Sequence, residues 1–224
     1  MDTEHPPALR TGIVPPDRVE VGDLVMRRWQ VGDMAAEFAA ISASFEQLHH
    51  WMAWAAQPPD FEEMAATHAR SSAWPTPDGG FNYGVFDRAG TVLGVVGLHD
   101  RVGPATLEIG YWCHSEHVGR GVITRTAGAL TTVALSLPGI DRVEIHCDAA
   151  NLRSAAVARR LGYRLESTGP RAVCTPGESG RGMHWVMDRA TRSARGVAQA
   201  DQARPSHSFT SLAPSVLHMA CTIL

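Results

Sequence analysis

The chain reads E-H-V-G-R-G-V-I-T-R from Glu116 to Arg125, and this stretch decides how the rest is interpreted. An apolar run over 107–113 precedes it, and a helical pattern that begins near Val122 follows it. Two glycines between a strand and a helix form a loop whose backbone N–H groups can converge on one anion. Glycine has no Cβ in the way, and the helix dipole adds positive potential. We therefore expect the loop to bind a pyrophosphate.

The spacing of this loop differs from that of the common nucleotide-binding loops. The chain contains no lysine, so the lysine-dependent phosphate loop of NTPases is excluded. The dinucleotide fingerprint G-x-G-x-x-G also fails, because Thr124 stands where the third glycine belongs after Gly119 and Gly121.

A second informative segment lies about thirty residues further on. Residues 141–148 have the pattern of a strand, and Asn151 is a good N-cap for the short helix that follows. Arg159 and Arg160 suit the C-terminal end of the helix dipole, and Gly162 suits the position after the last turn.

Together the two segments resemble the acyl-CoA N-acyltransferases called GNATs, and within them the RimJ/RimL-type ribosomal-protein N-terminal acetyltransferases. The resemblance covers roughly residues 20–188. The matching strings are L-E-I-G-Y-W (107–112), V-G-R-G-V-I-T (118–124), N-L-R-S-A-A-V-A-R-R-L-G-Y (151–163), L-V-M-R-R-W (24–29) and F-N-Y-G-V-F-D (81–87).

The sequence predicts an α+β fold, and the resemblance implies a mixed, mostly antiparallel central sheet of about six to seven strands with helices on both faces. We expect a loose N-terminal segment (1–19), an acyltransferase domain (20–188) and a C-terminal extension (189–224). The extension is polar at first and more apolar towards its end, so it is either flexible or docks on its own domain or on a second subunit.

Composition narrows the class of protein. With 224 residues and a net charge of −3, nothing favours nucleic acid or an anionic membrane as a partner. The acidic start is no signal peptide, and no stretch reaches the ~18 apolar residues of a membrane helix. The four cysteines match no zinc or redox spacing, and His49-His50 lacks a third ligand in register. We expect a cytoplasmic protein without a metal.

The resemblance implies an enzyme that transfers an acyl group, acetyl by default, from acyl-CoA to a primary amine by direct attack on the thioester. The acceptor could be the N-terminal α-amino group of a protein or peptide. The alternatives are a small-molecule amine, such as an antibiotic, a polyamine or an amino acid, and a non-catalytic CoA-binding module. Whether the chain forms a homodimer stays open.

The resemblance also implies which residues bind the cofactor. The expected contacts are Trp112 and Cys113 for the pantetheine arm, Val118, Gly119, Arg120, Gly121, Val122, Ile123 and Thr124 for the phosphates, and Asn151 and Arg160. Val118 replaces the usual Gln or Arg, and Ile123 replaces the last glycine. Both positions act mainly through backbone N–H groups. The alternative roles are a helix cap alone for Asn151 and a solvated helix end for Arg160.

Glu108 is the leading candidate for the general base, because it lies in an otherwise apolar strand that should line the cleft. Its alternative role is an outward-facing charge or a structural pair, and Asp100, His99 and His146 are alternative bases. By resemblance Ser154 protonates the departing thiolate, although it could simply bond to the backbone of the first helical turn.

An aromatic pair, Trp51 and Trp54, falls in the region that walls the acceptor cleft in the family. These side chains could clamp a peptide or a planar amine, or they could pack in the core.

Overall fold

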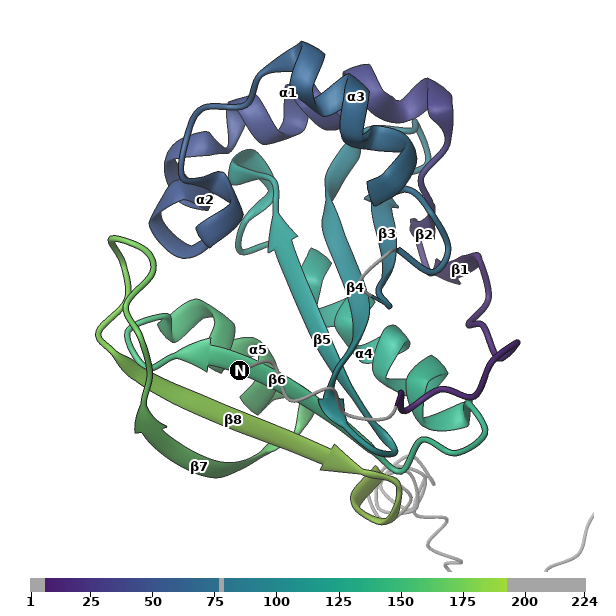
Figure 1. The fold of residues 1–224 in the computed structure, drawn as a ribbon, viewed down its shortest axis with the longest axis vertical. Helices are drawn as coiled ribbons and strands as arrows, with labels where there is room; N and C mark the ends of the chain where they lie inside the picture. Colours follow the sequence, from purple (N-terminus) through teal and green to yellow (C-terminus); the bar gives the residue numbers. More distant parts are fainter. Residues whose placement is uncertain (1–6, 77–78, 193–224) are drawn as a thin grey trace, which may run out of the picture.

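The computed structural model describes residues 7–76 and 79–192 (Figure 1). Most of the expected C-terminal extension, 193–224, therefore lies outside the described residues, as do residues 1–6. No helix in the described part of the chain combines the length and the apolar character needed to cross a lipid bilayer.

A single sheet of eight strands organises the molecule. The strands are β1 (Arg18–Val21), β2 (Leu24–Arg28), β3 (Phe81–Phe86), β4 (Val92–Gly103), β5 (Thr106–Cys113), β6 (Arg142–Asp148), β7 (Arg164–Pro170) and β8 (Arg181–Asp188). Their order across the sheet is β1-β2-β3-β4-β5-β6-β8-β7. In this sheet only β5 and β6 pair in parallel, so the predicted α+β class and mostly antiparallel sheet are confirmed.

The strand count exceeds the expected six to seven because of β1. This short strand begins inside the segment expected to be loose and pairs with β2 as an edge hairpin. The preceding residues are also ordered: Ala8 and Leu9 are buried, and both backbone N–H groups donate to the Asp100 carboxylate, at 2.9 and 3.2 Å. Residues 7–19 therefore pack on the domain instead of lying loose beside it.

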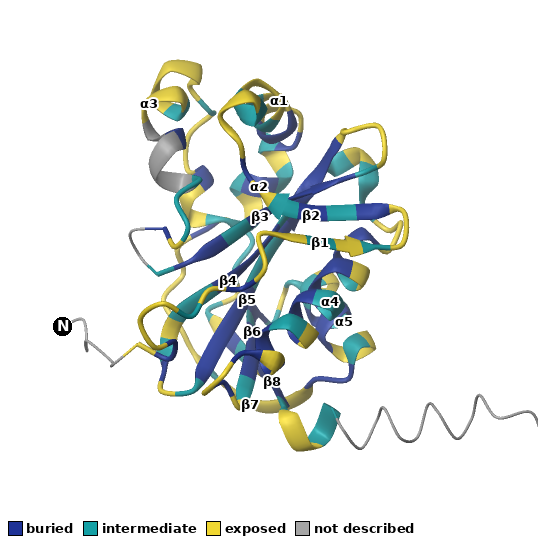
Figure 2. Cartoon of the chain, turned by 90° about the vertical axis from the view of Figure 1, so that its right-hand side faces the viewer, coloured by how far each residue is buried: buried dark blue, intermediate teal, exposed yellow. Residues whose placement is uncertain are grey.

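Helices cover both faces of the sheet, as Figure 2 shows, with their exposed sides turned outward. They are α1 (Met34–Ala43), α2 (Phe45–Trp51), α3 (Phe61–Ser71), α4 (Val122–Ser136) and α5 (Leu152–Leu161), with short 3₁₀ turns η1 (Val31–Asp33), η2 (Ala53–Ala55) and η3 (Ser115–His117). Asp33 is the N-cap residue of α1, but its side chain makes no capping hydrogen bond to that helix. Its carboxylate instead binds the Arg27 guanidinium, at 2.6 and 2.8 Å.

Strand alternation separates two apolar cores. Tyr83 and Val85 point into the larger core under α4 and α5, whereas the next residue, Phe86, joins the smaller core under α1 and α2. Tyr111 and Trp112 divide between the two cores in the same way. Burying a side chain of this size contributes roughly 1.5–3 kcal/mol. Alternate residues of the same strands therefore stabilise the helices on both faces of the sheet.

The pairing between β5 and β6 is short and decides where a site can form. The two strands pair only from Thr106 to Glu108 on β5, opposite Arg142 to Glu144 on β6. Beyond these residues they diverge, which is visible in Figure 1 between the labels β5 and β6. The C-terminal part of β5, from Ile109 to Cys113, therefore pairs with a strand on one edge only, and that strand is β4.

Candidate active site

The glycine loop lies where the diverging strand β5 is connected to α4. Gly119 and Gly121 have φ values of +81° and +76°, which only glycine adopts without strain. A Cβ added at either position would meet no atom within 4 Å, so the surface of the loop is open. The loop conformation, and not a lack of space, requires these glycines.

Backbone N–H groups are what this loop offers to a ligand. Gly121 is the N-cap of α4, and its carbonyl accepts the first helical hydrogen bond, from Arg125 N–H at 3.0 Å. Helix geometry therefore leaves the N–H groups of residues 122–124 without an i−4 acceptor. Val122 and Ile123 are only 5% and 8% exposed and point into the core, while Arg120 is exposed. The replacement of a glycine by Ile123 thus places no side chain over the backbone amides.

The exposed edge of β5 offers a second set of backbone groups. His114 N–H donates to Leu93 O at 2.9 Å, so Cys113 and Gly94 form a non-hydrogen-bonded pair of the antiparallel ladder. Because N–H and C=O groups alternate between the edges of a strand, Ile109, Tyr111 and Cys113 direct theirs towards the divergence. The Cys113 carbonyl accepts a hydrogen bond from Gln47 at 3.0 Å.

The two side chains expected beside a pantetheine arm point in opposite directions. Trp112 is buried against the smaller core, on the α1 and α2 side. Cys113 is half-buried against the larger core, and burial raises the pKa of its thiol to about 11. That thiol is therefore protonated at neutral pH, and any contribution of Trp112 to a pantetheine site comes from an edge of its ring, because its backbone groups face β4.

The first turn of α5 faces the same divergence. Asn151 caps the helix, because its side-chain oxygen accepts from Ser154 N–H at 3.0 Å, and Gly162 ends the helix with a φ of +84°. The Ser154 hydroxyl lies 2.9 Å from the Tyr111 hydroxyl, which also donates to Ser154 O at 3.3 Å. Burial raises the pKa of Tyr111, so this phenol stays protonated. Tyr111 is a polar partner of Ser154 that the sequence analysis did not name.

Glu108 lies at the point where β5 and β6 separate, on the face of the sheet opposite Leu107 and Ile109. It is 7% exposed and forms a bidentate ion pair with Arg101, at 2.8 and 2.9 Å. Burial alone would raise the pKa of Glu108, but the Arg101 guanidinium, with smaller contributions from His146 and His99, holds it below its ordinary value. The structure therefore shows the structural ion pair, and the carboxylate is ionised, as a general base would have to be; its catalytic role stays a prediction.

The three alternative bases have different surroundings. Asp100 is occupied by the backbone of Ala8 and Leu9. The His99 ring covers Gly97 and Gly110, since a Cβ on either glycine would come within 3.2 and 2.9 Å of its Nε2. His146 lies between two carboxylates, with Nε2 2.5 Å from Glu144 and Nδ1 3.7 Å from Glu108. The structure thus groups His99 and His146 with Glu108 and removes Asp100 from that group.

The aromatic pair beside α2 is split. Trp51 packs edge-on against His50, with ring centroids 4.7 Å apart, whereas Trp54 is 57% exposed in η2. Among the described residues the two indoles do not contact each other. The His50 carbonyl accepts from Gly177 N–H at 2.9 Å, so this end of α2 meets the β7–β8 loop.

Arg160 lies apart from the glycine loop. It is exposed near the C-terminal end of α5, next to Leu161, which packs on Gly128 in the middle of α4. Its contact with a phosphate stays a prediction.

Comparison with known proteins places these features in a family. Residues 23–164 match the acetyltransferase (GNAT) domain. YdaF of Bacillus subtilis, provisionally named a ribosomal N-acetyltransferase, is 37% identical over 79 residues, which are 34% of this chain and 43% of that protein. The chain thus spans less than half of the length of this curated relative.

Two solved structures are similar in fold. One is the microcin C7 self-immunity acetyltransferase MccE with acetyl-CoA and AMP, at a TM-score of 0.69 and 20% identity, covering 78% of this chain and 98% of that one. The other is RimL, a ribosomal L7/L12 α-N-protein acetyltransferase, in complex with coenzyme A. Its TM-score is 0.66 and its identity 21%, and the match covers 78% of this chain and 99% of that one. At these identities the likeness establishes the fold alone.

Proposed function

The chain belongs to the GNAT acetyltransferase family, and we propose that it transfers an acetyl group from acetyl-CoA to the N-terminal α-amino group of a protein or peptide in the cytoplasm. The family and the enzyme class expected from the sequence are thereby confirmed, while acyl group, acceptor and site residues belong to the proposal. The observation that carries it is two sets of backbone N–H groups, one on the edge of β5 that faces the divergence and one in the first turn of α4 after the glycine loop.

In this proposal the backbone holds the acyl donor. The N–H groups of residues 122–124 bind the diphosphate, and the free edge of Ile109, Tyr111 and Cys113 binds the pantetheine arm. The same edge supplies N–H donors for the oxyanion, and one such donor contributes about 3–4 kcal/mol in other enzymes. Arg120 is exposed, so it serves as a secondary phosphate contact at most.

Two side chains move the protons. Glu108 takes a proton from the amine through a water molecule, and its ion pair with Arg101 keeps it ionised at neutral pH. Ser154 protonates the departing thiolate. Because Tyr111 can donate to the Ser154 hydroxyl, the hydrogen of that hydroxyl is available for the sulfur.

The acceptor is argued from chemistry and from the names of the relatives. An α-amino group with a pKa of about 7.7–8.0 is roughly 10–15% neutral at pH 7, whereas a lysine amine is only about 0.04% neutral. An N-terminal acceptor therefore suits a weakly basic carboxylate such as Glu108. YdaF and RimL are both named for acetylation of ribosomal proteins, and RimL for the α-amino group.

Release of free thiol from acetyl-CoA tests this function. Peptides with a free N-terminus, the same peptides with a blocked N-terminus and an internal lysine, and small amines such as polyamines serve as acceptors. We expect release with the free N-termini and a sharp loss in Glu108→Gln. Faster thiol release with small amines would show that the acceptor is a small amine and not a protein N-terminus. Binding of coenzyme A without thiol release in the presence of any acceptor would show that the protein is a non-catalytic CoA-binding module.

A further inference from the structure

The neighbouring strands β6 and β8 carry two histidines directly opposite each other. His146 and His184 are cross-strand partners, and their rings stack with centroids 4.3 Å apart and planes inclined by 14°. Glu144 precedes His146 by two residues, so its side chain emerges on the same face of the sheet. Two residues of one strand and one of its neighbour thus converge on the face of the sheet that also carries Glu108.

The ligand atoms of these three side chains are close enough to share one ion. One atom from each lies within 4.8 Å of the other two, and Glu144 Oε2 is 2.5 Å from His146 Nε2. His184 is exposed, and the torsion about its Cβ–Cγ bond is broad. A rotation of this ring therefore brings its nitrogen to the point that the other two atoms share.

The surrounding contacts are those that orient metal ligands in proteins. Arg142 Nε binds Glu144 Oε1 at 2.5 Å and leaves Oε2 directed at His146. The second ring nitrogen of His146, Nδ1, faces Glu108 Oε2 at 3.7 Å. A carboxylate beside the non-ligating nitrogen of a histidine holds its tautomer and makes the other nitrogen a better donor.

We propose that Glu144, His146 and His184 form a binding site for one divalent transition-metal ion, Zn²⁺ by preference. Two imidazoles and a carboxylate are a ligand set that zinc accepts, with the fourth position left to water or to another ligand. The site lies next to Glu108, which faces the other ring nitrogen of His146. From the cysteine spacing and the missing third ligand of His49-His50 we expected no metal. The pairing of His146 with His184 becomes apparent only when β6 and β8 are placed in register.

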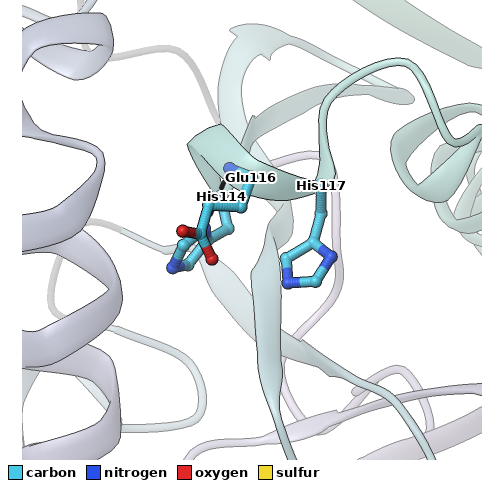
Figure 3. A group of neighbouring side chains, drawn as sticks. All are labelled: His114, Glu116 and His117. Atoms are coloured by element: carbon cyan, nitrogen blue, oxygen red, sulfur yellow. Dashed lines mark hydrogen bonds between the residues drawn. The ribbon is translucent and has the colours of Figure 1, made fainter.

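A second group of similar composition provides the contrast. Figure 3 shows His114, Glu116 and His117 in and around η3, just before the glycine loop. Here His114 Nδ1 already accepts from Glu116 N–H at 3.2 Å, and Arg120 lies 3.4 Å from His117 Nδ1. The Arg120 guanidinium lies next to a ligand atom itself, whereas Arg142 binds the Glu144 oxygen that the ion would not use, so the same residue types are arranged less favourably for a metal.

Metal binding by the full-length, untagged protein tests the proposal without acetyl-CoA and without turnover. After dialysis against a chelator, Zn²⁺ is titrated calorimetrically, and Co²⁺ is followed by its visible absorption. We expect one ion per chain and an affinity at least about 10-fold weaker in His184→Ala. The double variant His114→Ala/His117→Ala is the matched control and should bind as wild type does.

The melting temperature of the metal-free variants separates ligation from folding. His184 is exposed, so His184→Ala should melt as wild type does, and Glu144→Gln gives a second test through a side chain of equal size. Zn²⁺ binding that survives both variants, or that disappears in the control, would overturn the proposal. So would the absence of saturable binding in wild type. Acyl transfer by a protein without the metal would leave the proposed function intact.

Discussion

The glycine loop and the apex of the β5–β6 divergence are the two halves of the candidate site, and they are built in opposite ways. The loop consists of consecutive residues, and its binding groups are backbone amides whose directions follow from two positive φ angles. The apex consists of side chains from β4, β5, β6 and β8, namely Arg101, Glu108, Glu144, His146 and His184, which are distant in the sequence.

The loop can be recognised from local sequence, whereas the apex can be recognised only from strand register. A strand, two glycines and a helix lie within a short stretch of sequence, so the position of the loop was predicted correctly. The ion pair between Arg101 and Glu108 depends on a β-bulge between His99 and Gly103, and the histidine pair depends on register. The comparison therefore predicts that substitutions at the loop affect binding of the acyl donor, while substitutions at the apex affect turnover.

The largest effect is expected at the apex. Glu108→Gln removes the proposed general base and should lower kcat/KM by about 10²-fold or more, because such proton transfers contribute 10²–10⁴-fold. Steady-state kinetics with a free-N-terminal peptide measures this effect. Binding of acetyl-CoA, followed by calorimetry, should stay as in wild type.

Glu116→Gln is the matched control for this variant, since Glu116 is an exposed carboxyl close to the loop. It should retain turnover. Equal losses of kcat/KM in Glu108→Gln and Glu116→Gln would show that the apex has no special role in turnover.

At the loop, Gly121→Val should weaken acetyl-CoA binding by about 10-fold or more. A β-branched residue with φ near +76° costs at least about 1–3 kcal/mol, and the first-turn amides move with it. Calorimetric titration measures the affinity. Arg120→Ala, one residue earlier, is the control and should bind almost as wild type does, because its side chain is exposed. If Arg120→Ala were the weaker binder, the loop would act through a side-chain charge.

Ser154→Ala should lower kcat, by up to about 10²-fold, with little change in acetyl-CoA affinity, because only the departing thiolate needs the proton. Tyr111→Phe removes the hydroxyl that lies 2.9 Å from the Ser154 hydroxyl and should lower kcat less. The double variant measured against both single ones tests whether the two hydroxyls act together. Additive losses would show that they act independently.

The pH dependence should report the acceptor amine. Because Arg101 holds the pKa of Glu108 below its ordinary value, this carboxylate is ionised throughout the neutral range. kcat/KM should rise with pH towards the α-amine pKa of about 7.7–8.0. In Arg101→Met burial remains without the guanidinium, so the pKa of Glu108 should rise and its protonation should steepen the fall of kcat/KM on the acidic side of the amine limb. An acidic slope identical to that of wild type would count against Glu108 as the general base.

The smallest effect concerns stability alone. Asn151→Ala removes the hydrogen bond to Ser154 N–H and should lower the free energy of unfolding by about 1 kcal/mol. Denaturant unfolding measures this change. If the free energy of acetyl-CoA binding decreased much more than the free energy of unfolding, Asn151 would contact the acyl donor directly as well as cap the helix.

The sequence predicted the fold class, most strands and the helix after each informative segment, because these follow from local periodicity and capping residues. It missed β1, a short edge strand with little burial, and the packing of Ala8 and Leu9 on Asp100, which is a long-range contact. It also missed Tyr111, although strand alternation with Leu107 and Ile109 places that side chain on the α5 side. Arg101 gave no local signal, because its position beside Glu108 depends on the bulge in β4.

The most direct test of the account compares coenzyme A with pantetheine, which lacks the diphosphate and the nucleotide, by calorimetric titration of wild type and Gly121→Val. The account predicts that wild type binds coenzyme A at least about 100-fold more tightly than pantetheine. It also predicts that Gly121→Val lowers the affinity for coenzyme A but leaves the affinity for pantetheine unchanged. Equal affinities for the two ligands in wild type would contradict a diphosphate site on the backbone of the glycine loop.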